Sequence, residues 1–232
     1  MAILRCEAVS KLYGKKPALE NVNISIEPGR VVGLLGPNGS GKTTLIKLIN
    51  GLLVPSAGKI SIAGNAPGVK SKAEVSYLSD KPSLASWMNA EQLLDFFEDF
   101  YADFQRDRAE EMLNRLGIDK ELRIKQMSKG TIEKVQLIMV MSRKAKLYLL
   151  DEPIAGVDPA AREYILSTIV SNYNPDASII ITTHLITDVE QVLDDFVFLG
   201  FGGTVLMSGN AEEARNQNGK SLDQLFREVF KC

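Results

Sequence analysis

A glycine-rich loop at residues 36–44 constrains this chain of 232 residues more than any other feature. It reads Gly-Pro-Asn-Gly-Ser-Gly-Lys-Thr-Thr, and it lies between the apolar run 31–35 and the helix-like stretch 45–49. Glycines at this spacing let a backbone bend around an anion and turn its N–H groups toward it, ahead of the positive end of a helix. The loop therefore predicts a phosphate-binding site. The alternative is an ordinary glycine-rich turn that happens to contain a lysine.

Two side chains of the loop are suited to a nucleoside triphosphate. Lys42 can reach the β- and γ-phosphates, and the Thr43 hydroxyl can bind Mg²⁺. The fixed positions of the pattern G-x-x-x-x-G-K-[ST] are all present, in the strand-loop-helix setting that the pattern requires. The residues expected to hold the nucleotide are Gly36, Pro37, Asn38, Gly39, Ser40, Gly41, Lys42, Thr43 and Thr44.

Composition limits the class of protein. The chain is 45% hydrophobic and 24% charged, as in a soluble globular domain, and its net charge of −2 argues against a broad nucleic-acid-binding face. Two cysteines make no disulfide framework and suit a reducing compartment, so the cytosol is the default. The N-terminus has no secretory signal pattern, and the longest apolar run, 196–207, is too short to span a bilayer.

Strand and helix patterns alternate along the chain, which favours an α/β fold with a mostly parallel sheet. Residues 85–145 contain no convincing strand, whereas 90–104 and 107–116 have apolar residues at helical spacing, with Gly117 as a stop. A helical insertion therefore interrupts the sheet domain, and residues 221–230 predict a terminal helix capped by Ser221. The expected strands are 3–9, 22–26, 31–35, 59–62, 147–150, 178–182, 196–199 and 204–207.

A pair of carboxylates ends the apolar run 147–150. In an open α/β sheet the ligand crevice lies at the carboxyl ends of the strands. Asp151 is then placed to hold Mg²⁺, and Glu152 to orient or deprotonate an attacking water. An ordinary acidic turn after a strand is the alternative.

The single histidine, His184, follows another apolar run at the expected crevice. Its imidazole could donate a hydrogen bond to the terminal phosphate and so sense whether that phosphate is present. Taken alone, a histidine at such a position is more often a surface residue or a satisfied core residue.

These motifs, in this order and spacing, resemble the ATP-binding subunit of ABC transporters over nearly the whole chain. Residues 36–43 match the Walker A motif, 147–151 the Walker B motif, Glu152 the catalytic glutamate and His184 the switch histidine. The resemblance implies a P-loop NTPase that binds ATP and Mg²⁺, with an antiparallel β region at its N-terminus. It implies one domain, 1–232, with a nucleotide-binding core of 1–82 and 146–232 and a helical subdomain of 83–145.

The resemblance also assigns two further positions. Tyr13 falls where the family stacks an aromatic ring on adenine, although an aromatic residue at a strand edge can instead pack on the core. Asp158, within residues 155–158, matches the acid of the family's D-loop, which contacts the second subunit of the dimer.

The signature of the family, Leu-Ser-Gly-Gly-Gln, corresponds here to residues 127–131 and is spelled differently. Ser128 can cap a helix at 132–143, and Gly130 can leave N–H groups free for an anion, while Lys129 and Thr131 depart from the family pattern. In the family this segment binds the terminal phosphate held by the opposite subunit, which implies a head-to-tail dimer. A capped helix start without a ligand is the alternative.

Asp80 is a further departure, since the family usually places a glutamine there beside Mg²⁺ or the attacking water. Aspartate can still bind Mg²⁺ through water, but it adds a third carboxylate near Asp151 and Glu152. The alternative is a simple turn acid before Pro82.

The resemblance implies two protein partners: a second ATPase subunit and a separate transmembrane permease, with the chain peripheral on the inner face of the cell membrane. Residues 82–89 would dock on the permease through Trp87 and Met88, unless both pack inside the helical subdomain. The motif spelling is similar to bacterial ABC-2 export systems, which move antibiotics, peptides, lipids or polysaccharides. The alternatives are a regulatory half of a heterodimer, which the intact Glu152 and His184 disfavour, and a soluble ABC protein without a transport role.

Overall fold

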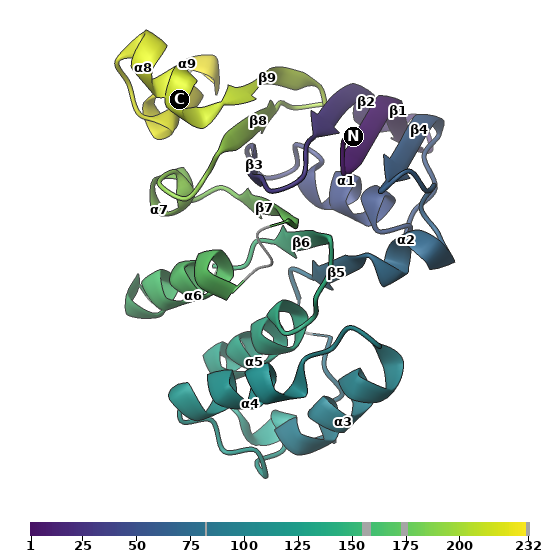
Figure 1. Ribbon diagram of the computed structural model, residues 1–232. Helices are drawn as coiled ribbons and strands as arrows, with labels where there is room; N and C mark the ends of the chain where they lie inside the picture. The colour runs from purple at the N-terminus through teal and green to yellow at the C-terminus, as the bar shows by residue number, and fades with distance from the viewer. Residues whose placement is uncertain (82, 155–158, 173–175, 231–232) are drawn as a thin grey trace.

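A central sheet of six strands organises the molecule (Figure 1). The computed structural model describes residues 1–81, 83–154, 159–172 and 176–230. The sheet order is β5-β6-β7-β3-β8-β9, and all neighbouring strands are parallel except β8 and β9, which are antiparallel. Its strands are β3 (Val31–Leu35), β5 (Val75–Leu78), β6 (Leu147–Asp151), β7 (Ser178–Thr183), β8 (Asp195–Leu199) and β9 (Val205–Asn210).

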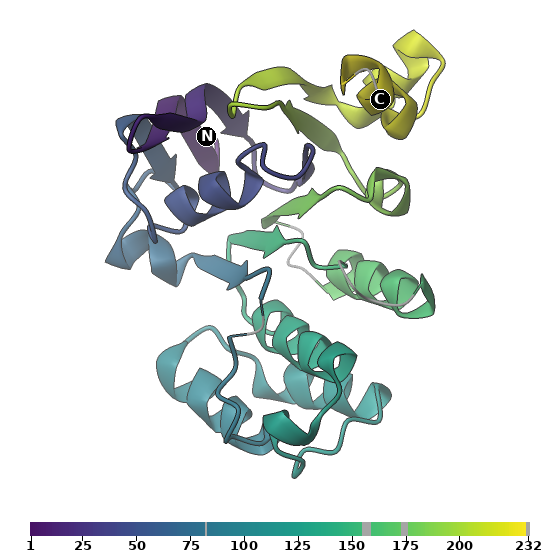
Figure 2. The same ribbon diagram turned by 180° about the vertical axis from the view of Figure 1, so that it is seen from behind.

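A smaller antiparallel sheet is formed by the N-terminal part of the chain. Its order is β2-β1-β4, from β1 (Leu4–Tyr13), β2 (Lys16–Ile26) and β4 (Ala57–Ile62). Helix α1 (Lys42–Ile49) lies beside it in both views (Figures 1 and 2). The fold class is therefore as predicted: a mostly parallel core sheet with an antiparallel region at the N-terminus.

Both faces of the central sheet are buried. Successive side chains of a strand point to opposite faces, so each strand contributes to two cores. In β6, Leu147 and Leu149 pack in one core with α1 and the antiparallel sheet. Tyr148 and Leu150 pack in the other core, which the helices on the opposite face cover. This double burial explains why the parallel strands read as nearly continuous apolar runs rather than as alternating ones.

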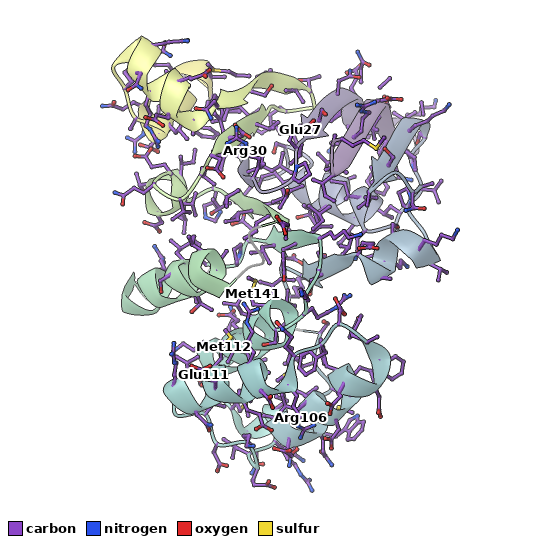
Figure 3. All side chains as sticks on the ribbon, viewed as in Figure 1. Glu27, Arg30, Arg106, Glu111, Met112 and Met141 are labelled. Atoms are coloured by element: carbon purple, nitrogen blue, oxygen red, sulfur yellow. The ribbon has the colours of Figure 1, made fainter. Side chains whose placement is uncertain are left out.

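The predicted helical insertion lies between β5 and β6. It contains α3 (Ala90–Phe100), α4 (Arg106–Arg115), the short 3₁₀ helix η1 (Ile124–Gln126) and α5 (Lys129–Met141), at the bottom of Figure 1. Met112 of α4 and Met141 of α5 are buried where these two helices face each other (Figure 3). Gly117, at φ +62°, follows the end of α4 as expected.

Arg143 joins the helical part to the central sheet. Its side chain is only 4% exposed. Nε and Nη2 donate to the Asp103 carboxylate at 3.0 and 3.1 Å, and the guanidinium lies 4.0 Å from the ring of Tyr101. Nη1 donates to the carbonyl of Val75 at 2.6 Å, and Nη2 to that of Ala73 at 3.0 Å. One buried cation thus connects the loop after α3 to the start of β5.

The remaining helices surround the sheet or follow its last strand. The terminal helix is as predicted, because Ser221 Oγ accepts from the Gln224 N–H at 3.2 Å and caps it. No helix within the described residues is both long and apolar enough to cross a membrane. These helices are α2 (Val69–Ala73), α6 (Pro159–Asn172), α7 (Ile186–Val189), α8 (Ala211–Asn218) and α9 (Leu222–Phe230).

Several predicted boundaries are wrong. Strand β5 was missed, because it is short and carries the polar Ser76, whose hydroxyl is buried and donates to the Val140 carbonyl at 2.8 Å. The helix expected at 90–104 ends at Phe100, since Tyr101 is extended with its ring under Arg143. The helix expected at 132–143 is α5, which begins at Lys129 and ends at Met141. Strands β1 and β2 are longer than predicted.

Candidate nucleotide-binding site

The glycine-rich loop follows β3 and turns directly into α1. Gly41 precedes the helix at φ +100°, a conformation that glycine adopts readily and other residues rarely. A Cβ on Gly41 would lie 2.5 Å from the Ala18 carbonyl oxygen, and one on Gly36 would lie 2.4 Å from that of Leu199. Close backbone contacts therefore require glycine at both positions, and the backbone conformation favours it at Gly41 as well.

Lys42 is the first residue of α1 and is folded back onto its own loop. Its Nζ donates to the Gly36 carbonyl at 2.7 Å and to the Pro37 carbonyl at 3.3 Å, and it lies 3.7 Å from Glu152 Oε1. Burial lowers the pKa of the Lys42 ammonium, and the negative charges of Glu152 and Asp151 oppose that shift. The loop thus holds a largely desolvated cation against the acid pair.

A pocket of about 320 Å³ opens over this loop. It brings together residues from β2, the loop, α1, the segment after β5 and the end of β6. Three predicted loop residues lie behind it: Ser40 is fully buried, and Gly36 and Pro37 turn their carbonyls to Lys42. The pocket is lined by Ala18, Asn38, Gly39, Gly41, Lys42, Thr43, Thr44, Asp80 and Glu152.

Asp151 ends β6 with a carboxylate that is fully buried. Its Oδ1 accepts from Thr182 Oγ1 at 2.6 Å and from Thr43 Oγ1 at 3.2 Å. Its Oδ2 is buried and has no partner among the described residues. Burial raises the pKa of Asp151, while the hydrogen bonds from Thr182 and Thr43 act in the opposite direction. The acid is therefore oriented by two hydroxyls and retains one oxygen for a further ligand.

Glu152 adopts a rare backbone conformation, with φ at +52°. Its N–H lies 2.9 Å from Thr182 Oγ1 and 3.1 Å from the Thr182 carbonyl, and it donates to both. Its side chain lines the pocket, where Oε2 lies 3.0 Å from His184 Nδ1. His184 is not among the lining residues and reaches the pocket through this contact.

The signature-like segment forms the first turn of α5. Ser128 is the N-cap, as predicted, since its Oγ accepts from the Thr131 N–H at 3.1 Å. Lys129 is 76% exposed, with Nζ 3.8 Å from Glu133 Oε1. Of the described residues that line the pocket, none comes from this segment. Within the described residues, the segment is therefore not part of this pocket.

Two other predicted residues lie apart from the pocket or outside the described part of the chain. Tyr13, at the end of β1, is 51% exposed, with the Lys11 ammonium 5.5 Å from its ring centre, so it is not packed into the core. Asp158 lies outside the described residues.

The part played by Thr182 was not predicted. The strand expected at 178–182 includes this residue, but nothing in the sequence singled out its hydroxyl. The available signal was a polar residue near the end of an apolar strand. Its meaning depends on the pairing of β7 with β6, which places Thr182 opposite Asp151. Parallel strands are joined by long crossover connections, so the residues next to Thr182 do not indicate which residue lies opposite it.

The glycine-rich loop joins a parallel strand to a helix and faces an acid at the end of another strand. This arrangement defines a P-loop nucleoside triphosphatase. The helical part between β5 and β6 distinguishes the chain within that class. The family model for ABC transporters matches residues 19–155, and the chain belongs to that family.

Relatives support the same assignment. The linearmycin resistance ATP-binding protein LnrL of Bacillus subtilis (strain 168) is 28% identical over 231 residues, which cover 96% of this chain and 74% of that protein. The ABC-type transporter ATP-binding protein EcsA of the same organism is 30% identical, covering 100% of this chain and 98% of its own. A solved ATP-binding subunit of an ABC transporter is 31% identical with a TM-score of 0.88, covering 98% of this chain and 99% of that one. This chain is therefore an ATP-binding subunit of the ABC ATPase class.

Proposed function

We propose that this chain binds ATP with Mg²⁺ in the pocket over the glycine-rich loop and hydrolyses it to drive a separate membrane permease. The observation that carries the proposal is the 3.7 Å separation of Lys42 Nζ and Glu152 Oε1 in one pocket. These groups come from distant parts of the chain. Their meeting brings the cation that would hold the phosphates next to the acid that would act on water.

The residues present fit a magnesium ion. Oδ2 of Asp151 is buried without a partner among the described residues, and Thr43 supplies a hydroxyl beside the same carboxylate. Among those residues no group of three acidic, histidine or cysteine side chains forms a metal site by itself. Phosphate oxygens and water would complete the shell, as is usual for this ion. When bound, Mg²⁺ neutralises phosphate charge during phosphoryl transfer.

In hydrolysis Glu152 is the base or the orienting group for the attacking water. Its carboxylate is placed between Lys42 on one side and His184 on the other. His184 holds that carboxylate at the end of β7 and is the group proposed to respond to the terminal phosphate. Asp80 lines the same pocket and is proposed to reach the ion through water.

A second ATPase subunit is proposed to complete each site. The N-terminal end of α5 carries Ser128, Lys129, Gly130 and Thr131, and the positive end of a helix favours a bound phosphate. Because this segment does not line the pocket of its own chain, it is proposed to face the pocket of the partner in a head-to-tail dimer. Asp158 is assigned to the same interface. Tyr13, half exposed, is proposed to stack on adenine.

The permease is proposed to dock near residues 82–89, of which Pro82 lies outside the described residues. Trp87 is 63% exposed, whereas Met88 is partly buried against the core, so Trp87 is the proposed anchor. The relative LnrL is a linearmycin resistance protein, which supports export of an antibiotic, peptide, lipid or polysaccharide. The chain would then be cytoplasmic and peripheral on the membrane. The core of 1–82 and 146–232 and the helical subdomain of 83–145 stay proposed boundaries.

The test combines hydrolysis with assembly. The purified protein is expected to hydrolyse ATP only with Mg²⁺. Glu152→Gln is expected to bind ATP, to hydrolyse it about 10²- to 10⁴-fold more slowly and to elute as a dimer in gel filtration. A protein that binds no adenine nucleotide would contradict the proposed activity. Co-purification of the protein with a membrane protein from its own cells, lost on Trp87→Ala, tests the proposed partner.

A further inference from the structure

Thr182 lies where the two acids of the proposed site meet. It belongs to β7, next to β6 in the central sheet (Figure 2), and its Cα pairs with that of Asp151. Its side chain is fully buried. The hydroxyl donates to Asp151 Oδ1 at 2.6 Å and accepts from the Glu152 N–H at 2.9 Å. One buried hydroxyl therefore bonds to two consecutive residues with different proposed tasks.

The bond to Asp151 fixes which carboxylate oxygen is free. With Oδ1 taken by Thr182 and Thr43, only Oδ2 is left without a partner among the described residues. Loss of the 2.6 Å bond would let the carboxylate rotate and would leave Oδ1 with the longer contact of 3.2 Å alone. The oxygen available to a metal would then no longer be defined.

The bond to Glu152 supports an unfavourable backbone. A non-glycine residue at φ +52° persists only where its surroundings hold it. Here the Glu152 N–H is held by both the hydroxyl and the carbonyl of Thr182. That backbone conformation directs the Glu152 side chain into the pocket, toward Lys42 and His184.

We propose that Thr182 is a positioning residue that sets the Asp151 carboxylate for the metal and the Glu152 carboxylate for water through one hydroxyl. The inference rests on the proposed function, because it assigns a task within that same site. Hydrogen-bond partners of a metal ligand typically change metal affinity or activity by about 10- to 100-fold when removed. Thr182 has this relation to Asp151 and adds a backbone bond to the proposed base.

The test compares variants that differ in this hydroxyl. Thr182→Val removes it at nearly constant volume, Thr182→Ser retains it, and Thr182→Ala gives a second hydroxyl-free variant should the first fail to fold. Ser178→Ala is the matched control. It removes a buried hydroxyl from the opposite end of β7, where Ser178 Oγ donates to the Glu27 carbonyl at 3.0 Å.

Two measurements are made on each variant. Mn²⁺ binding to protein saturated with a non-hydrolysable ATP analogue is followed by electron paramagnetic resonance, and affinity for the analogue is measured in EDTA. Thr182→Val is expected to lower Mn²⁺ affinity and kcat by about 10- to 100-fold each, with little change in analogue affinity. Thr182→Ser is expected to restore both, and Ser178→Ala to leave both near the parent values.

The result that overturns the inference is Mn²⁺ affinity and kcat in the hydroxyl-free variants equal to those of the parent. A loss that Thr182→Ser fails to restore would also overturn it, because the hydroxyl would then not be responsible. If the parent itself binds no adenine nucleotide, the proposed function fails instead. The two failures are thus distinguished by the parent measurement alone.

Discussion

Glu152 Oε2 and His184 Nδ1 lie 3.0 Å apart, at the ends of two neighbouring strands. The other oxygen, Oε1, is 3.7 Å from Lys42 Nζ. One carboxylate thus connects the glycine-rich loop to the end of β7. A substitution of Lys42 or of His184 should therefore also affect the Glu152 carboxylate.

The first prediction concerns this pair. Glu152→Gln and His184→Ala are each expected to lower kcat, Glu152→Gln by about 10²- to 10⁴-fold, the usual contribution of a positioned general base. Since the two side chains are in contact, the double variant should lose much less than the product of the single losses. The rates of the parent, the two single variants and the double variant at saturating ATP form a double-mutant cycle. Fully multiplicative losses would mean that the two residues act independently.

Lys42 is expected to be essential for nucleotide affinity. Lys42→Ala should weaken ATP binding by about 10- to 100-fold, because hydrogen bonds to charged groups are worth roughly 1.5–3 kcal/mol. Lys47→Ala, on the same helix, removes a lysine that does not line the pocket and should bind ATP like the parent. Fluorescence titration with a labelled nucleotide measures both. Retained affinity in Lys42→Ala would contradict the placement of the phosphates.

Asp80 is expected to act on the metal requirement. Asp80→Asn should raise the Mg²⁺ concentration for half-maximal hydrolysis by up to about fivefold, since an exposed charge pair is worth roughly 0.2–1 kcal/mol. Asp99→Asn, which neutralises an exposed acid on α3, is the control. An unchanged Mg²⁺ titration would remove Asp80 from the site and leave it a simple turn acid.

Asp151 is expected to destabilise the nucleotide-free protein at neutral pH. Burial raises its pKa in the folded state, so the folded protein binds the proton more tightly than the unfolded chain. Stability is therefore lost as pH rises from the ordinary carboxyl range through the raised value. Asp151→Asn should have a higher Tm than the parent at pH 7, and the difference should shrink in acid. Thermal melts across pH measure it, and an equal or lower Tm at pH 7 would contradict it.

Arg143 is expected to be the most costly polar residue to remove from the junction with the helical part. Arg143→Ala removes the donor to the Asp103 carboxylate and to the carbonyls of Val75 and Ala73. Breaking a fully buried pair costs about 3–5 kcal/mol, and since Asp103 is 26% exposed we expect a loss near the lower end of that range. Arg115→Ala, an exposed pair with Glu111, should change stability by less than about 0.5 kcal/mol. Urea unfolding measures both, and similar losses would show that the junction is not stabilised by this cation.

The sequence predicted those features that are continuous along the chain. The glycine-rich loop, the acids after 147–150 and His184 each follow an apolar strand, and their local pattern indicates their place at a strand end. Contacts between segments could not be read in this way. Tyr101 ends α3 because its ring lies under Arg143, although the helical periodicity continues beyond it. Thr182 acquires its contacts only through strand register.

The backbone of Glu152 has a consequence for selection experiments. An L-residue in the left-handed region costs about 1–2 kcal/mol relative to one in its preferred conformation, and glycine avoids that cost. A library of variants selected only for thermal stability should therefore be enriched in glycine at this position. Such variants are expected to have lost ATP hydrolysis. Thermostabilisation of this scaffold needs turnover as a second filter, because glycine, which best fits this backbone conformation, lacks the carboxylate that is proposed to act on water.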